Sequence, residues 1–126
     1  MKKILVVDDD ESIVEVVQLV LEGEGYSVQT NTDGNLLPLL KKERPDLILL
    51  DMVLSGVDGR DICKKLKSDR ETVRIPVIML SAHSETDKAA DASGADDYLE
   101  KPFDVDALIA IVERHLASTS PEIHPK

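Results

Sequence analysis

The chain has 126 residues, a formal net charge of -10, 42% hydrophobic and 32% charged residues, which fits one globular domain of ordinary composition. The acidic charge argues against direct nucleic-acid binding by this chain, because nucleic-acid binders need a basic face. No apolar run could span a membrane, no signal peptide is recognisable, and one cysteine cannot form an internal disulfide, so we expect a cytoplasmic protein without membrane contact.

Short apolar runs alternate with longer segments of helical periodicity, a pattern typical of β-strand–α-helix units on a parallel sheet. Five of these runs are expected strands, at residues 4–7, 26–30, 47–50, 77–80 and 98–99. The first helix follows the first strand. Ser12 and Glu15 fit a capping box at its start, and Gly23 and Gly25 are expected to end it.

The second and third helices follow the second and third strands. The second is expected near residues 35–43, with a late start, because a helix tolerates Pro38 only in its first turn. After a loop, Asp58 can cap a third helix that runs to about Ser68. Cys63 lies at helical spacing on this segment and is expected to be a core or boundary thiol rather than a reactive one.

The last two helices differ in character. The fourth, up to Gly94 from about residue 84, contains mainly small residues and has no large apolar anchor. The fifth is expected over residues 104–117 and has a regular apolar stripe. We therefore expect one domain at residues 1–117, followed at 118–126 by a flexible tail or the start of a linker.

These units predict an α/β fold: a (βα)5, doubly wound, five-stranded parallel sheet with the flavodoxin-like strand order 2-1-3-4-5. Such a sheet places the carboxyl ends of its strands on one edge, where ligands bind. The first and third strands are neighbours, so Asp8, Asp9 and Asp51 should meet there. Ser81 and Lys101, at the ends of the fourth and fifth strands, should reach the same edge.

This set of side chains suits phosphoryl transfer onto a carboxylate. Clustered carboxylates repel one another and need a cation, and hard oxygen ligands favour Mg²⁺, for which Mn²⁺ can substitute. Lys101 adds a positive charge, and Ser81 can donate a hydrogen bond to a phosphoryl oxygen. Asp51 stands alone at the end of its strand, and we predict that it is the nucleophile.

The chain carries an ordered series of motifs at its strand ends. They are Asp8-Asp9, Asp51, Asp58-Gly59, Ser81-Ala82 and Lys101-Pro102-Phe103. This series resembles the response-regulator receiver domains of two-component signalling, and in particular the single-domain chemotaxis regulators. The resemblance covers residues 2–117, which is essentially all of the expected folded part.

The resemblance implies that Asp51 is phosphorylated by the phosphohistidine of a sensor histidine kinase or a histidine phosphotransfer protein. It implies a Mg²⁺ site made by Asp51 and Asp9, by Asp8 directly or through water, and by the backbone carbonyl of Val53. The domain would then assist its own phosphorylation and dephosphorylation, as a signalling module rather than as an enzyme with a separate substrate.

The resemblance also implies how the signal leaves the site. Lys101 would contact the phosphoryl group, its bond to Pro102 would be cis, and Ser81 and Tyr98 would form the switch pair. Phosphate on Asp51 would draw Ser81 toward it and let Tyr98 move inward, which changes a surface over the fourth helix, fifth strand and fifth helix. The downstream effector is not identified by the sequence, and a phosphorylation-dependent homodimer is compatible with it.

Several positions depart from the family's usual pattern. Ser55 stands where proline is frequent, and Ser81 keeps the hydroxyl of the commoner threonine. Val53 and His83 occupy the positions that tune dephosphorylation, and the apolar Val53 predicts a long-lived phosphoaspartate. The segment from Ser81 to Gly94 is shorter than usual by about two residues, roughly half a helical turn. We therefore expect a loosely packed, mobile fourth helix.

Other polar residues have simpler interpretations. Asp10 is expected to cap the first helix, and Asp96 and Asp97 to form the turn before the last strand. His115 and His124 are expected to face solvent, since no histidine spacing here indicates a transition-metal site.

Two other functions compete with the phosphorelay interpretation. Asp8 and Asp10 after a first strand resemble the nucleophile motif of haloacid-dehalogenase-type phosphatases, with Ser81 and Lys101 as supporting residues. In that family, however, the last acidic pair follows the lysine, whereas residues 96–97 precede it, and a cap insertion is missing here. The second alternative is a receiver-like interaction module that is not phosphorylated.

Overall fold

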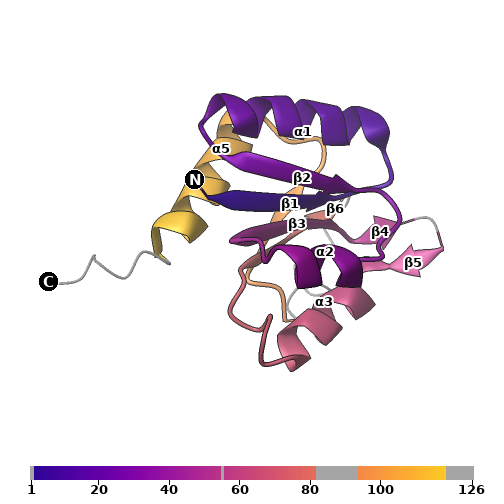
Figure 1. The fold of residues 1–126 in the computed structure, drawn as a ribbon. Helices are drawn as coiled ribbons and strands as arrows, with labels where there is room; N and C mark the ends of the chain where they lie inside the picture. The colour runs from indigo at the N-terminus through magenta and orange to yellow at the C-terminus, as the bar shows by residue number, and fades with distance from the viewer. Residues whose placement is uncertain (1, 55, 82–93, 119–126) are drawn as a thin grey trace, which may run out of the picture.

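Five parallel strands form one sheet in the order β2-β1-β3-β6-β7, with helices on both faces (Figure 1). The computed structural model describes residues 2–54, 56–81 and 94–118. The strands of this sheet are β1 (Lys3–Val7), β2 (Ser27–Asn31), β3 (Leu47–Asp51), β6 (Val77–Ser81) and β7 (Asp97–Glu100). Counted along the chain, this order is 2-1-3-4-5, which confirms the predicted topology.

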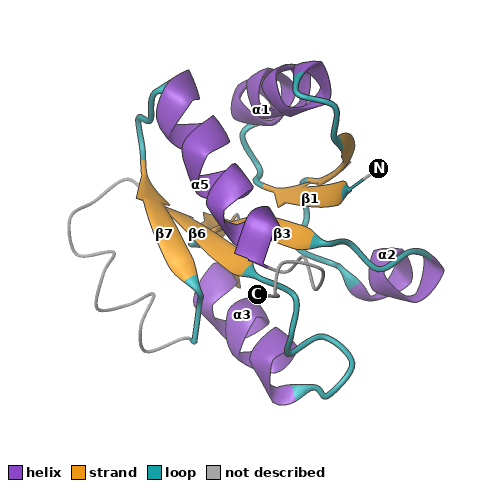
Figure 2. Cartoon of the chain, turned by 90° about the vertical axis from the view of Figure 1, so that its left-hand side faces the viewer, coloured by secondary structure: helices purple, strands orange, loops and turns teal. Residues whose placement is uncertain are grey.

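Each face of the sheet carries its own hydrophobic core. One pair of helices, α1 and α5, covers one face, and α2 and α3 cover the other (Figures 1 and 2). Alternation along β1 divides the cores, because Ile4 and Val6 pack on the α1 side whereas Leu5 and Val7 pack on the α3 side. The helices are α1 (Glu11–Gly23), α2 (Leu37–Lys42), α3 (Gly59–Ser68) and α5 (Val105–Ser118).

The central strand β3 fixes the position of Asp51. All five residues of β3 are buried, as expected for a strand of a parallel sheet that is covered on both faces. Asp51, its last residue, pairs with Leu80 of β6, and Leu50 pairs with Val7 at the end of β1. The register therefore brings the residue that follows β1 to the same edge as Asp51.

Helix α1 begins differently from the predicted capping box. Its N-cap is Asp10, whose Oδ1 accepts the N–H of Ser12 at 3.0 Å and of Ile13 at 3.3 Å. The assignment of Ser12 as the cap was wrong, because the carboxylate of Asp10 accepts the hydrogen bonds of the first free amides. The helix therefore begins at Glu11, and Ser12 lies inside its first turn. The predicted role of Asp10 as a cap is confirmed, and α1 ends at Gly23 as expected.

The other described helices match their predictions closely. Helix α2 begins at Leu37 and keeps Pro38 in its first turn, which confirms the late start. Helix α3 is capped by Asp58, whose Oδ1 accepts the N–H of Arg60 at 2.9 Å, and it ends at Ser68. Cys63 is fully buried on this helix, as predicted. Apart from Gly94, the predicted fourth helix falls outside the described residues, as does His83.

A short hairpin replaces the simple loop expected after β3. Strands β4 (Val53–Leu54) and β5 (Val57–Asp58) pair antiparallel, and Gly56 takes a positive φ of 72° between them. The loop expectation was incomplete because two-residue strands are too short to show a sequence period. No described helix is long and apolar enough to cross a membrane.

Candidate phosphoryl-acceptor site

Three carboxylates converge where β1 and β3 end. Asp8, Asp9 and Asp51 each offer an oxygen, and these atoms lie within 4.8 Å of one another. Asp8 and Asp51 are buried, whereas Asp9 is exposed. The predicted meeting of these three acids is therefore present in the structure.

Backbone amides hold the two buried carboxylates in place. Oδ1 of Asp8 accepts the N–H of Asp10 at 2.9 Å, and Oδ1 of Asp51 accepts the N–H of Val53 in a longer contact of 3.4 Å. In both contacts the carboxylate accepts the N–H of the residue two positions later. Each acid is therefore held by the loop that directly follows its strand.

A glycine at the start of α3 supports the backbone of Asp51. The N–H of Gly59 donates to the carbonyl oxygen of Met52 at 2.8 Å. A Cβ at Gly59 would lie only 2.0 Å from the carbonyl oxygen of Asp51. Only glycine fits this approach without a backbone shift. Gly59 was noted in the sequence as part of a motif, but its packing role depends on a tertiary contact that no local pattern reveals.

Lys101 places an ammonium group among the carboxylates. Its Nζ lies 2.8 Å from Oδ2 of Asp8 and 3.3 Å from Oδ1 of Asp51. The peptide bond between Lys101 and Pro102 is cis, as the resemblance implied. The predicted contact between a lysine after the last strand and the acids is therefore present.

The electrostatics of the site show an excess of negative charge. Burial and the charge of Asp8 raise the pKa of Asp51 to about 6, although Lys101 and the Val53 amide act in the opposite direction. Burial alone would lower the pKa of Lys101, but its hydrogen bond to Asp8 and the charges of Asp51 and Asp8 raise it overall. One ammonium group does not neutralise three carboxylates. This donor set of carboxylate oxygens fits a hard divalent cation such as Mg²⁺.

The remaining predicted site residues lie at different depths. Ser81, the last residue of β6, is buried, whereas Tyr98 on β7 is 38% exposed. Val53 follows Asp51 by two residues and is 72% exposed. The structure thus places Ser81 at the edge of the sheet that carries the acids, and Tyr98 in a partly exposed position on the neighbouring strand β7.

The prediction that His115 faces solvent was wrong. Its Nε2 lies 2.8 Å from Oδ2 of Asp97, and only 18% of the side chain is exposed. Burial alone would raise the pKa of Asp97, but hydrogen bonds from His115, the Tyr98 amide and Arg114 lower it overall. This contact joins α5 to β7, and its two residues lie 18 positions apart in the sequence. The spacing of histidines alone, on which the prediction depended, does not reveal such a contact. His124 lies outside the described residues.

The neighbouring Asp96 has a structural role at the turn before β7. Its Oδ2 accepts the N–H of Val77 at 2.8 Å and a hydrogen bond from Lys67 Nζ at 2.6 Å. The predicted turn role therefore holds for Asp96, whereas Asp97 already belongs to the strand. Asp10, the second acid of the phosphatase-like motif, is engaged in the α1 cap. This arrangement weakens the phosphatase alternative.

The fold and this edge define a receiver domain of the two-component type. The family model described as the response regulator receiver domain matches residues 4–113, and the chain belongs to that family. Among solved structures, the signal receiver domain of a signal transduction histidine kinase from Syntrophus aciditrophicus has a TM-score of 0.88 at 30% identity. That alignment covers 95% of this chain and 93% of the other.

Curated relatives are longer proteins. The DNA-binding dual master transcriptional regulator RpaA of Synechocystis sp. is 43% identical over 122 residues, covering 94% of this chain and 51% of the relative. The phosphate regulon transcriptional regulatory protein PhoB of Rhizobium meliloti is 40% identical over 124 residues, covering 96% and 55%. The chain therefore spans about half the length of these relatives.

Proposed function

We propose that this receiver domain accepts a phosphoryl group on Asp51 from the phosphohistidine of a sensor histidine kinase or a histidine phosphotransfer protein. The observation that carries the proposal is the position of Asp51, buried beside Asp8 and Asp9, with Lys101 Nζ 3.3 Å from its Oδ1. A buried nucleophile flanked by acids and one ammonium group fits phosphoryl transfer better than passive binding.

The transfer itself needs little beyond positioning and charge. The Asp51 carboxylate attacks phosphorus, the bond from phosphorus to the histidine nitrogen breaks, and the imidazole leaves with the bonding electrons. With a pKa of about 6, Asp51 is mainly ionised at neutral pH and can act as this nucleophile. Lys101 can follow the transferred group as a point charge, since its ammonium already contacts Asp51.

A divalent cation completes this proposal. Asp8, Asp9, Asp51 and the backbone carbonyl of Val53 would hold Mg²⁺, with Mn²⁺ as a substitute. The fit rests on three carboxylate oxygens within 4.8 Å of one another and on the negative balance of charge at the site. When bound, Mg²⁺ supplies positive charge that offsets the charge of the phosphoryl oxygens.

The signal would leave the site through Ser81 and Tyr98. The Ser81 hydroxyl, at the end of the strand beside β3, would donate a hydrogen bond to the phosphoryl group. Tyr98, now 38% exposed on β7, would move inward in response. Such a movement changes the surface formed by β7 and α5, which an effector can then recognise.

We infer that any DNA-directed output lies outside the segment shared with the relatives. That segment is about half of RpaA and PhoB, whose names describe DNA binding or transcriptional regulation. The net charge of -10 on this chain opposes contact with a phosphate backbone. The segment therefore suits a receiver that reports to an effector.

Phosphorylation by a small donor tests the proposal directly. The protein is incubated with acetyl phosphate and Mg²⁺, and intact-mass spectrometry counts the phosphoryl groups added. We expect one group on the parent protein, none after addition of EDTA, and none on Asp51→Asn. As a matched control, Asp58→Asn removes a nearby exposed carboxylate and should still be labelled. Equal labelling of both variants, or none of the parent, would refute the proposal.

A further inference from the structure

A cavity lies between α2, α3 and the loop that follows α3. Its volume is about 380 Å³, within the range of about 300 to 1,000 Å³ that is usual for small-molecule sites. None of the three clustered acids, nor Lys101, is among its described lining residues, so the cavity is distinct from the Asp51 site.

The body of the cavity is aliphatic. It is lined by Leu36 and Leu40 from the α2 side and by Ile62 and Leu66 from α3. Leu36 and Leu66 belong to the core and are each 5% exposed, whereas Leu40 and Ile62 are half-buried. Helix α2 has only six residues, so it covers this side of the sheet incompletely and leaves apolar side chains facing a hollow.

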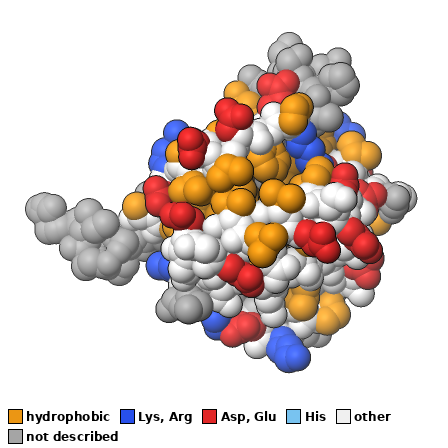
Figure 3. All heavy atoms as spheres, turned by 90° about the horizontal axis from the view of Figure 1, so that it is seen from above, with side chains coloured by type: hydrophobic (Ala, Val, Ile, Leu, Met, Phe, Trp, Pro, Cys, Tyr) orange, Lys and Arg blue, Asp and Glu red, His pale blue; other side chains and the backbone are white. Residues whose placement is uncertain are grey.

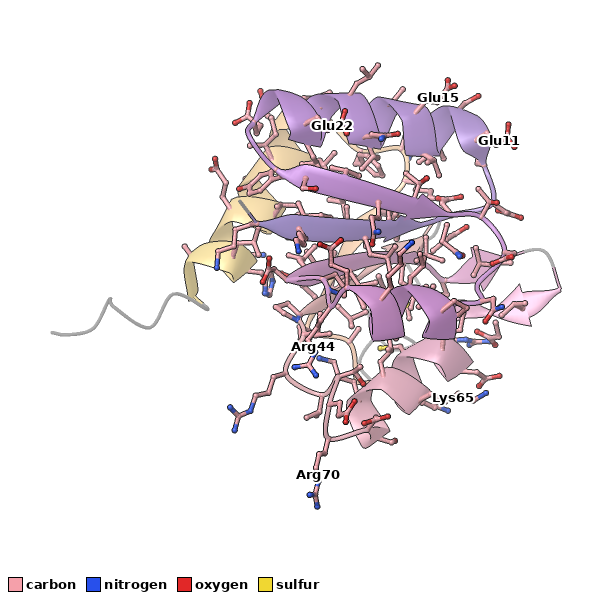
Figure 4. All side chains as sticks on the ribbon, viewed as in Figure 1. Glu11, Glu15, Glu22, Arg44, Lys65 and Arg70 are labelled. Carbon is pink, nitrogen blue, oxygen red and sulfur yellow. The ribbon has the colours of Figure 1, made fainter. Side chains whose placement is uncertain are left out.

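Acidic and basic side chains both line the cavity, Asp69 and Glu71 from the loop after α3 and Arg44 and Lys65 from the other sides. Asp69 turns back on its own loop, where its Oδ1 accepts the N–H of Glu71 at 2.8 Å. Arg44 and Lys65 also line the cavity, and neither makes an ion pair with any residue that the structure describes. Figure 4 shows Arg44 beside the end of α2 and Lys65 on α3, whereas Arg70 extends away from the molecule.

Charge along the chain favours an anion on this side of the molecule. Residues 8–24 contain seven Asp and Glu and no Lys or Arg, and acidic side chains surround an apolar strip in the view onto α1 (Figure 3). Residues 41–74, which include α3 and Arg44, contain nine of the 15 Lys and Arg against seven Asp and Glu. An anionic ligand is therefore repelled more strongly from the α1 side than from the cavity side.

We propose that this cavity binds a small hydrophobic carboxylate. The aliphatic or aromatic body would lie among the four leucine and isoleucine side chains, and the carboxylate would pair with the guanidinium of Arg44. A guanidinium can donate two parallel hydrogen bonds to a carboxylate, and Lys65 adds a second positive charge. A concave site of this volume suits a small molecule better than a flat protein surface.

The cavity wall offers reporters for binding. Gly34 lines the cavity, and a Cβ at this position would lie 3.2 Å from Leu54 Cδ1 and 3.3 Å from Ile62 Cδ1. A ligand that fills the cavity should therefore shift the amide resonances of Gly34, Ile62 and Leu54 together.

Octanoate is the probe, and octanamide is its uncharged counterpart. Both are titrated into the isotope-labelled, unphosphorylated protein without Mg²⁺ and followed by amide NMR, so the result does not depend on phosphorylation of Asp51. We expect octanoate to shift the Gly34 and Ile62 resonances saturably and to bind more tightly than octanamide. Arg44→Gln should weaken octanoate binding about tenfold, or about 1.4 kcal/mol, and leave octanamide binding unchanged. Arg70→Gln, an exposed arginine outside the cavity lining, should change neither.

Three results would overturn the proposal. The first is no saturable shift up to the solubility limit of octanoate. The second is an equal loss of affinity in Arg44→Gln and Arg70→Gln, which would indicate non-specific attraction to positive charge. The third is movement of the same resonances with protein concentration alone, which would identify a second copy of the chain as the occupant.

Discussion

Lys101 Nζ lies 2.8 Å from Oδ2 of the fully buried Asp8, although 93 positions separate these residues in the chain. The contact ties the end of β7 to the end of β1 and lies across the edge at which β3 presents Asp51. The same ammonium group thus stabilises a buried carboxylate and faces the proposed phosphoryl acceptor.

Replacing this lysine should damage both stability and phosphorylation. Lys101→Met leaves Asp8 buried without its counter-charge, and loss of one partner of a buried ion pair costs about 3 to 5 kcal/mol. We expect a loss of this size in urea unfolding at pH 7 in EDTA, and little labelling by acetyl phosphate. The exposed pair of Arg60 and Asp58 gives a control, because Arg60→Met breaks a solvent-screened ion pair and should cost far less than Lys101→Met. Similar losses in the two variants would mean that the Lys101 contact is not a stabilising one.

The acid cluster should make Asp51 a source of instability when no cation is bound. Its pKa is about 6 in the folded protein and near 3.8 in the unfolded chain, so the folded state binds the proton more tightly. The contribution of Asp51 to the free energy of unfolding is therefore most favourable below about pH 4. It is lost as the pH rises from about 4 to about 6.

Asp51→Asn removes this penalty. In EDTA at pH 7, we expect the variant to be more stable than the parent by about 3 kcal/mol, and the difference to vanish toward pH 4. Urea unfolding between pH 4 and pH 7.5 measures it. Asp58→Asn serves as the control, because its hydrogen bond to Arg60 lowers the pKa of Asp58 and the sign is opposite. A constant difference across this range would contradict the assigned cause.

The close approach of α3 to Asp51 predicts a sharp effect of one methyl group. Gly59→Ala places a Cβ 2.0 Å from the Asp51 carbonyl oxygen, so the backbone of β3 or α3 must shift. We expect a loss of about 2 to 3 kcal/mol in urea unfolding. Gly23→Ala, at the end of α1 with no atom within 4 Å, should be neutral or gain up to about 1 kcal/mol. If the two substitutions have equal effects, the close contact is not present in solution.

The sequence was most informative about residues that strands carry to a common edge. The apolar runs that precede Asp8 and Asp51 predict two neighbouring parallel strands. Strands buried on both faces are typical of a parallel sheet, so few other folds fit such runs. The lysine after the last strand could be placed with them because the carboxyl ends of parallel strands lie on one edge of the sheet. These parts of the site follow from the strand order alone.

What the sequence could not predict depends on contacts between distant segments. The approach of Gly59 to Asp51, the pairing of His115 with Asp97 and the cavity beside α2 each involve elements that meet only in the folded chain. The start of the first helix was ambiguous in the sequence for a different reason. Two suitable residues, Asp10 and Ser12, lie two positions apart, and local propensity does not separate them.

The side chain of Val53 should set the lifetime of the phosphorylated state. Val53 lies two residues after Asp51, its N–H contacts the Asp51 carboxylate, and the residue is 72% exposed beside the site. An isopropyl group cannot orient the water that hydrolyses a phosphoaspartate, whereas a carboxamide can. We expect Val53→Asn to lose the phosphoryl group faster, on the order of tenfold, through better orientation of that water.

The protein is labelled with acetyl phosphate, the donor is removed, and intact mass is followed over time. Val57→Asn makes the same chemical change on the opposite strand of the hairpin and should leave the lifetime unaltered. Loss of phosphate from Val53→Asn at the parental rate, or equal acceleration in Val57→Asn, would rule out this role for Val53.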